Sequence, residues 1–269
     1  MDIQQIKSIL DEADAILVGA GAGMGVDSGL PDFRGNQGFW KAYPAIEKLG
    51  YSFSEMANPR WFKEKSRLAW GFYGHRLNLY RETLPHKGFK TILDIAKDKS
   101  GGLFVYTSNV DGQFQKAGFP EDSILECHGS IHHTQCIKGC SPIAKADNLT
   151  ISVDMNTFLA DEPLPKCPNC GSLLRPNILM FGDWDWDDTR AAKQTQHFEN
   201  WLARNYDSQI AILEFGAGKA VPTVRYMCER VVDTLNANLI RVNPRDFDGP
   251  NGTFGVSAGA VEFFDLLQD

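Results

Sequence analysis

The chain has 269 residues, of which 43% are hydrophobic and 23% charged, and its net charge is −7 with an isoelectric point of about 5.4. This composition is typical of a globular protein with one large domain, alone or with a smaller one, and it excludes a bulk electrostatic attraction to nucleic acid or to an anionic membrane. No apolar run reaches the ~18 residues that span a bilayer, and the first stretch lacks the pattern of a signal peptide, so we expect a cytoplasmic protein with no membrane partner.

Hydrophobic periodicity predicts strands alternating with helices. A helix over 4–13 leads into a buried strand over 15–21. Further strand-like runs cover 103–110, 177–183, 209–218 and 238–243, and helical stretches cover 186–205, 221–236 and 256–268. Alternation of this kind predicts an α/β fold in which helices cover both faces of a parallel sheet.

Two segments interrupt this alternation. Residues 36–100 contain many aromatic side chains but no convincing strand, and we interpret them as inserted helices and loops. Residues 130–175 hold four of the six cysteines together with several prolines and glycines. We interpret them as a second insertion.

The glycines of "VGAGAGMG" follow the first strand and precede a predicted helix. That context suits a phosphate-binding turn, because glycines let the backbone approach a pyrophosphate and a helix N-terminus offers free N–H groups. A glycine-rich turn without a ligand remains the alternative. The acidic residue expected ~20 positions further on in a standard dinucleotide site is not evident.

Polar residues end the strand of 103–110. Ser108, Asn109 and Asp111 lie at its carboxyl end, which is where ligands sit in open α/β sheets. A helix cap with a turn explains the same residues, and the sequence does not decide between the two.

A histidine and four cysteines follow. His128 comes after an apolar run and eight residues before Cys136, and a histidine can accept a proton near neutral pH. Cys136 and Cys140 form one pair, and Cys167 and Cys170 form a C-x2-C pair. Four thiolates at such spacings predict a closed structural zinc site that takes no part in the chemistry.

The segment "GAGMGVDSGLPDFRG" resembles the signature "GAGxSxxSGIPDFRG" of the sirtuins, the NAD-dependent protein deacylases. The segments "TSNVDGQFQKAG", "CHGSIHHTQC", "LRPNILMFGD", "EFGAGKAV" and "LIRVN" resemble later motifs of the family, in the same order. The resemblance implies a Rossmann-like NAD-binding domain over 1–35, 101–129 and 176–269. It also implies a helical module over 36–100 and a small zinc-binding domain over 130–175.

The resemblance also implies roles for single residues. His128 would be the general base, Asn109 would lie beside the reacting ribose, and Asp111 would hold the nicotinamide carboxamide. Further cofactor contacts are expected from two glycine turns, the "DFR" segment and two strand ends: Gly21, Ala22, Gly23, Asp32, Phe33, Arg34, Ser108, Gly216, Ala217, Gly218 and Asn243. The acyl-lysine peptide would contact Val110, Phe181, Gly182 and Asp183.

The implied function is an NAD-dependent deacylation of acyl-lysine, with nicotinamide and O-acyl-ADP-ribose as products. Departures from the family pattern keep a rival open, because Ser108 stands where a glutamine usually orients the histidine. Ala217 and Gly218 likewise replace threonine and serine. The rival is an ADP-ribosyltransferase or NAD hydrolase on the same fold. A module that only senses NAD would require Asn109, Asp111 and His128 to be idle.

Overall fold

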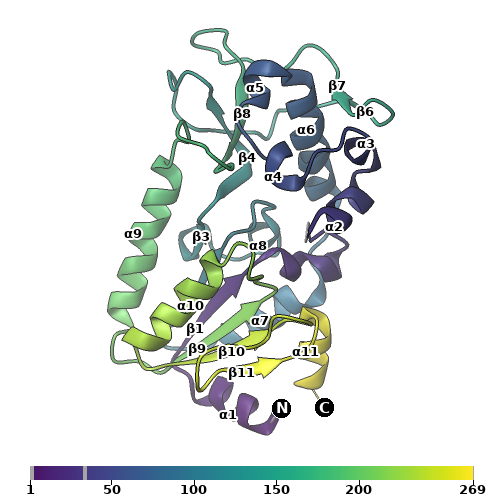
Figure 1. Cartoon of the computed structure of the whole chain (residues 1–269). Coiled ribbons are helices and arrows are strands. Elements are labelled where there is room, and N and C mark those ends of the chain that lie inside the picture. Colours follow the sequence, from purple (N-terminus) through teal and green to yellow (C-terminus); the bar gives the residue numbers. More distant parts are fainter. Residues whose placement is uncertain (1–2, 33–34, 269) are drawn as a thin grey trace.

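The computed structural model describes residues 3–32 and 35–268 of the chain, and it divides them into two lobes (Figure 1). The lower lobe is built on a sheet of six parallel strands in the order β11-β10-β9-β1-β2-β3. The strands are β1 (Ala15–Ala20), β2 (Gly102–Thr107), β3 (Ile124–Glu126), β9 (Ile210–Phe215), β10 (Ala237–Val242) and β11 (Phe254–Val256).

Helices cover both faces of this sheet. In β1, Ile16 and Val18 face one core and Leu17 faces the other, because successive side chains of a strand point to opposite sides. The first core includes helices α1 (Ile3–Glu12), α7 (Lys87–Ala96) and α11 (Ala260–Leu266). The second includes α9 (Thr189–Arg204) and α10 (Thr223–Thr234). The structure therefore confirms the α/β class and the covered parallel sheet.

The upper lobe combines the two insertions. Its helices are α2 (Gly35–Ala42), α3 (Pro44–Glu47), α4 (Phe53–Met56), α5 (Trp61–Glu64) and α6 (Ser66–Glu82). Its strands are β4 (Gly129–Cys136), β5 (Ala144–Lys145), β6 (Val153–Asp154), β7 (Leu159–Ala160) and β8 (Leu174–Ile178). They form an antiparallel sheet in the order β5-β4-β8 and a two-stranded β6-β7 hairpin.

One aromatic core joins the two insertions. Phe72 and Tyr73 of α6 pack in the same cluster as Phe158 and Ala160 of the hairpin. The helix touches the hairpin closely, since a Cβ added at Gly71 would lie 2.1 Å from the carbonyl oxygen of Phe158. The second insertion is therefore packed on the helical one rather than hanging from the sheet.

The segment 177–183 differs from its prediction as a strand of the parallel sheet. The strand there ends at Ile178, and it pairs antiparallel with β4 in the upper lobe. An apolar run indicates a buried strand but not which sheet it joins, because the partner is remote in the sequence. The three-residue strands β3 and β11 had no prediction, since each is too short to show a period.

The remaining elements are short. The 3-10 helix η1 (Ala22–Ser28) follows β1, α8 (Gln113–Lys116) follows β2, and η2 (Glu121–Ser123) precedes β3. Helix α7 falls within the range 36–100 that we assign to the helical module, yet its Phe89 and Ile92 pack in the core of the large sheet. In the part of the chain that the structure describes, no helix is both long and apolar enough to cross a membrane.

Candidate active site and metal centre

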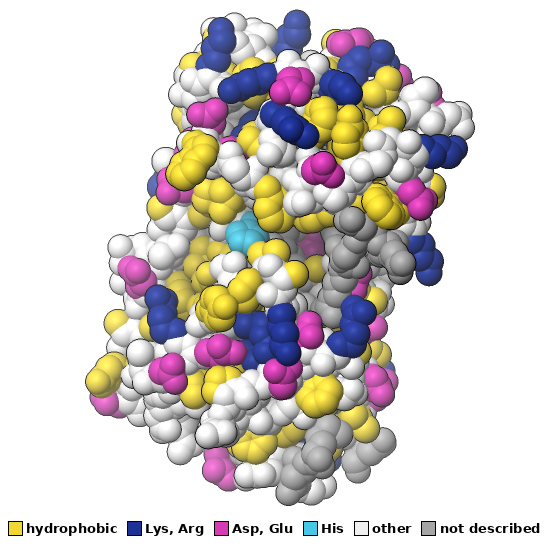
Figure 2. Space-filling model, viewed as in Figure 1, with side chains coloured by type: hydrophobic (Ala, Val, Ile, Leu, Met, Phe, Trp, Pro, Cys, Tyr) yellow, Lys and Arg dark blue, Asp and Glu magenta, His cyan; other side chains and the backbone are white. Residues whose placement is uncertain are grey.

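A cavity of about 920 Å³ lies between the lobes. Figure 2 shows the hollow on this face, with hydrophobic side chains gathered around it. The lower lobe contributes the segments that follow the carboxyl ends of β1, β2, β9 and β10: Gly21–Ala22, Ser108–Asp111, Gly216–Val221 and Arg245–Asp246. The upper lobe contributes residues of α4 and α6, and the loop after β8 closes the rim.

The turns after β1 and β9 touch backbone to backbone. A Cβ added at Gly21 would lie 2.7 Å from the Cα of Ala217, and one added at Gly216, where φ is +60°, would lie 2.3 Å from the Cα of Gly23. Only glycine permits both approaches. Gly21 and Ala22 line the cavity, whereas Gly23 lies outside its lining and donates its N–H to the oxygen of Gly216 at 3.2 Å.

A short chain of hydrogen bonds orients Asn109. The hydroxyl of Thr107 donates to the oxygen of Ala20 at 2.9 Å and accepts the N–H of Asn109 at 3.0 Å. The side-chain amide of Asn109 donates to the oxygen of Gly21 at 2.9 Å. These bonds join the glycine turn to the end of β2, and Asn109 lines the cavity at their junction.

Asp111 is buried beside it. One carboxylate oxygen accepts the N–H of Gln113 at 2.9 Å. Burial raises the pKa of this carboxyl to about 6, although that hydrogen bond and the charge of Arg76 oppose the shift. The carbonyl oxygen of Asp111 contacts Nε2 of His132 at 2.8 Å. Asp111 is therefore an acid whose charge changes close to neutral pH.

His128 lies between β3 and β4 and reaches the same cavity. Burial lowers the pKa of its ring, and a hydrogen bond to the backbone of Ser108 partly offsets that effect. The ring is neutral at pH 7 and able to accept a proton. Its orientation comes from the main chain of residue 108, so the exchange of glutamine for serine does not remove this particular support.

Three of the other predicted cofactor residues, Asp32, Ala217 and Gly218, line the same cavity. The carboxylate of Asp32 lies 3.8 Å from the guanidinium of Arg245. Phe33 and Arg34 lie outside the described residues.

Asn243 has a different position. It is fully buried and lies outside the lining of the cavity. Its side chain accepts the N–H groups of Arg245 and Asp246, both at 3.1 Å, and donates to the oxygen of Ala217 at 3.0 Å. It connects the segments that follow β9 and β10, and so supports residues that do line the cavity.

The predicted peptide contacts separate in a similar way. Val110 and Phe181 line the cavity. Gly182 and Asp183 do not, and the Asp183 carboxylate forms a buried ion pair with Arg175. Both main-chain groups of Phe181 already have partners, because its N–H donates to the oxygen of Ala57 at 2.9 Å and its oxygen accepts from Asn58 at 3.1 Å.

Three residues of α6 were missed by the sequence analysis: Tyr73, Arg76 and Tyr80. The guanidinium of Arg76 is buried and contacts the Tyr80 hydroxyl at 2.9 and 3.1 Å. It also lies 5.2 to 5.9 Å from the centres of four aromatic rings. The Tyr73 hydroxyl is buried without a partner among the described residues. Helical spacing is the sequence signal that could have identified these residues, because it puts Arg76 on the same face of α6 as Ala69, Tyr73 and Tyr80.

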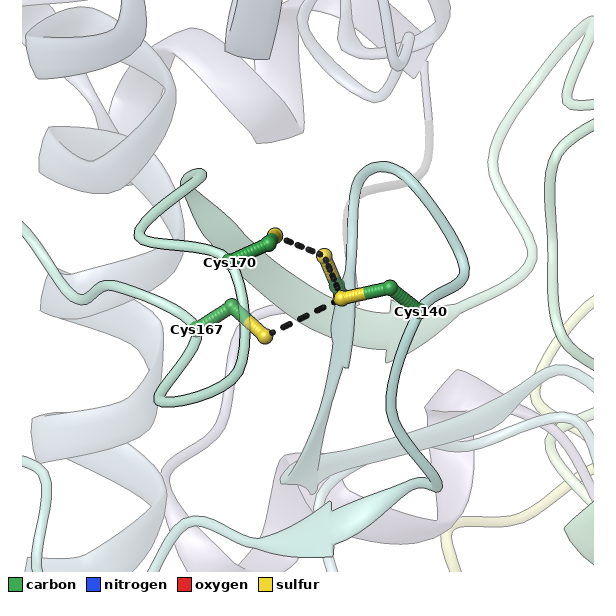
Figure 3. Close-up of side chains that lie close together, drawn as sticks. Cys140, Cys167 and Cys170 are labelled. Carbon is green, nitrogen blue, oxygen red and sulfur yellow. Dashed lines mark hydrogen bonds between the residues drawn. The ribbon is translucent and has the colours of Figure 1, made fainter.

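The four cysteines of the second insertion come together at one point. Figure 3 shows side chains from the ends of two loops pointing toward one another. The sulfur atoms all lie within 4.8 Å of one another, and three of the separations are 3.5 to 3.7 Å. Tetrahedral zinc with bonds of about 2.3 Å places its sulfurs ~3.8 Å apart. Cys136, Cys140, Cys167 and Cys170 therefore fit a closed four-thiolate metal site.

The loops also support the sulfurs from outside. The N–H of Lys138 donates to the sulfur of Cys136 at 3.4 Å, and the hydroxyl of Ser141 lies 3.4 Å from the sulfur of Cys167. Such outer contacts orient metal ligands and stabilise thiolates. Strand β4 begins at Gly129, next to His128, and ends at Cys136. The metal centre and His128 therefore lie at opposite ends of this strand.

Comparisons with known proteins found a matching family, related sequences and similar solved structures. The model of the Sir2 family matches residues 21–202. An NAD-dependent protein deacylase of Thermococcus kodakarensis is 35% identical over 65% of this chain and 62% of its own length. One from Pyrococcus furiosus is 33% identical over 66% and 65%, respectively. One from Leptospira interrogans is 28% identical over 87% and 83%.

The chain thus spans less than two thirds of the length of the archaeal relatives just described. Among solved structures, a Sir2 homologue in complex with NAD superposes with a TM-score of 0.70 at 23% identity, covering 100% of this chain and 93% of its own. A mutant Sir2 homologue in complex with ADP-ribose superposes with a TM-score of 0.71 at 24% identity, covering 100% and 96%. At these identities the superpositions show a shared fold.

Proposed function

The chain belongs to the Sir2 family, and on this premise we propose that it is an NAD-dependent protein-lysine deacylase. Its products would be the free lysine, nicotinamide and O-acyl-ADP-ribose. One observation carries the proposal: a single cavity receives the glycine turn, Asn109, Asp111 and His128, all from the carboxyl edge of one sheet. Ligands of open α/β sheets bind at that edge.

The residues present fit NAD. The paired turns at Gly21 and Gly216 offer a backbone surface without side chains, which suits a pyrophosphate. Asp111 would accept the amide hydrogens of the nicotinamide carboxamide, and Asn109 would face the ribose. When bound, NAD supplies the anomeric carbon that the acyl oxygen attacks and the nicotinamide that leaves. Phe33 and Arg34, as residues of the "DFR" segment, remain proposed contacts to that end of the cofactor.

His128 would serve as the general base. Its ring is neutral because burial disfavours the charged form, and the backbone of Ser108 holds its orientation. It would accept a proton from the ribose hydroxyls once nicotinamide has left. The four cysteines would hold zinc as a structural ion that joins two loops of the upper lobe, with no open position for catalysis.

Residues of the upper lobe would determine which acyl group is preferred. The buried guanidinium of Arg76 places a positive charge at the cavity wall, and the buried hydroxyl of Tyr73 on the same helix is a neutral hydrogen-bond donor. We therefore expect an acyl chain that ends in a carboxylate to be preferred over acetyl. The preference rests on the charge and position of Arg76.

The rival activity also has an observation in its favour. An added peptide strand needs free main-chain groups at its partner edge, and those of Phe181 are already bonded to Ala57 and Asn58. An ADP-ribosyltransferase or NAD hydrolase would not need that edge. Deacylation requires this contact to open or the peptide to pair with other groups of the loop.

Product analysis by mass spectrometry separates the alternatives. The full chain with its metal is incubated with NAD and matched peptides carrying free, acetylated or succinylated lysine. We expect O-acyl-ADP-ribose only with acylated peptide. Free ADP-ribose with every peptide, or an ADP-ribosylated target, would replace the deacylase proposal by its rival. NAD binding without nicotinamide release from any mixture would leave only a sensing role.

The proposed partner is an acylated-lysine protein or peptide, and we expect no nucleic acid because the chain is acidic. We also propose a cytoplasmic location. A reducing compartment keeps a four-thiolate site from oxidising to disulfides, which supports this location.

A further inference from the structure

A second cavity of about 290 Å³ lies behind Asp111. Two of its residues, Tyr80 and Asp111, also line the large cavity, so the two spaces share a wall. The remaining walls come from the end of α6, from α8, from β4 and the segment that begins at β5, and from the start of α9. Apart from Tyr80 and Asp111, none of the residues that line this cavity has a role in the proposed deacylation.

Two of the cations in its walls are already committed. The guanidinium of Arg81 donates to the oxygens of Ala146 and Leu149, both at 2.6 Å. The ammonium of Lys116 donates to the oxygens of Arg81 and Thr83 at 2.6 and 2.7 Å. The Lys116 bonds cap the carboxyl end of α6, and the Arg81 bonds tie that end to the segment after β5, so both cations are engaged with main-chain oxygens.

Two other nitrogen groups are buried without a partner, and a third group is an exposed cation. Arg190 pairs through Nη2 with Glu126 at 2.5 Å, while its Nη1 is buried without a partner among the described residues. Nδ1 of His133 is also buried, with no hydrogen-bond partner among the residues that the structure describes. Lys145 is exposed at the mouth, and no acid of the described residues lies within ion-pair distance of it. Leaving a buried donor unsatisfied costs roughly 1–3 kcal/mol, so an acceptor at this place is favoured.

The surrounding charges indicate the sign of that acceptor. Burial and the positive charges of Arg190, His132 and Lys145 lower the pKa of His133 to about 4, against a weaker opposing effect of Asp147. Two cationic groups, Arg190 and Lys145, therefore act on His133 in this part of the cavity, which favours an anion over a metal cation there. Of the acids that line this cavity, Glu121 and Asp147 are exposed and Asp111 lies at the wall shared with the large cavity. Behind Arg190, Glu126 is paired with Nη2, and its Oε1 is buried without a partner among the described residues.

We propose that this second cavity binds a small phosphate-type oxyanion, held by Arg190, Lys145 and His133. A guanidinium, an ammonium and a ring N–H together offer the donors that such an oxyanion accepts. The proposal is independent of the deacylase activity, since it concerns a different space and needs no turnover of NAD.

Two measurements on the full chain with its metal test the site. Inorganic phosphate is titrated by calorimetry, and the ring signals of His133 are followed by NMR as a local probe that phosphate in the glycine turn would not move. We expect saturable binding of one phosphate at the His133 probe and a rise in the pKa of His133, because an anion stabilises the charged ring. Ribose 5-phosphate in place of inorganic phosphate tells whether a phosphate ester is also accepted.

Lys145→Gln is the informative variant, because the side chain is exposed and its loss leaves no buried charge behind. We expect it to weaken phosphate binding about 10-fold, as the loss of one charged hydrogen bond does. Lys97→Gln, the same charge change at an exposed position outside the cavity, should bind as the wild type does. Unmoved His133 signals at millimolar phosphate, or unchanged binding by Lys145→Gln, would overturn the proposal.

Discussion

The two lobes approach the large cavity with different kinds of groups. The lower lobe presents backbone turns and short polar side chains at strand ends, held by bonds such as Asn109 to Gly21. The upper lobe presents aromatic rings from α4 and α6 together with Arg76 of α6. From this difference we infer that the strand ends of the lower lobe would supply the chemistry, which is the same for every substrate. Helix α6 of the upper lobe would select the acyl group.

The largest expected effect concerns the upper lobe alone. Cys167→Ser removes one of four metal ligands, and structural zinc contributes on the order of 10 kcal/mol to small metal-dependent folds. We expect loss of bound metal, and faster hydrogen exchange in β4, β5 and β8 than in β1 and β9. Cys228→Ser, a buried cysteine of the sheet core outside the cluster, is the control for metal content. A full complement of metal in Cys167→Ser would disprove the four-thiolate site.

A change in the lower lobe should act on all substrates alike. His128→Ala removes the proposed base, and general-base catalysis contributes about 10²–10⁴-fold to a rate. We expect kcat/KM to fall by that factor for acetyl and succinyl peptides equally, with NAD still bound. His197→Ala, a histidine of α9 outside the cavity lining, should be silent. Deacylation at the wild-type rate by His128→Ala would assign the base elsewhere.

A change in the upper lobe should instead be selective. Arg76→Gln removes the buried guanidinium, and a hydrogen bond to a charged group is worth about 1.5–3 kcal/mol, or ~10- to 100-fold. We expect kcat/KM for a succinyl-lysine peptide to fall by that factor while the value for acetyl-lysine changes less. Because the variant also loses a contact to Tyr80, its thermal stability is measured alongside. Equal losses for both peptides would remove the division of roles between the lobes.

The smallest effect is a pH dependence. Asp111 must be ionised to accept the carboxamide hydrogens, and its pKa is raised to about 6 by burial. His128 must be neutral, and its pKa is lowered by burial. Both requirements fail on the acid side, so kcat/KM should decline as pH falls through about 6, by tenfold per unit once Asp111 is protonated. Asp111→Asn should lower the plateau and move the decline to lower pH; an unmoved decline would assign it to another group.

Much of this architecture follows from local patterns in the sequence. The apolar runs at 15–21 and 209–218 indicated β1 and β9, because a buried parallel strand must be apolar on both faces. The pairs Cys136–Cys140 and Cys167–Cys170 indicated a metal site, because two loops with such spacings can each offer two thiolates. His128 was also predicted from local features, because it follows an apolar run and precedes the cysteines.

Only the tertiary structure decided which residues face the cavity and which support it. Asn243 and Asp183 lie in expected motifs, yet their side chains bond to Ala217 and Arg175 behind the lining. Arg76 lies in a stretch with no recognisable site pattern, yet it reaches the cavity wall. The sheet that β8 joins was likewise set by its pairing with β4. Local sterics and burial set the pattern of apolar and polar residues along each helix or strand, and the sequence alone determines that pattern. Which side chains reach the cavity depends on contacts with residues tens of positions away, and local periodicity does not specify those contacts.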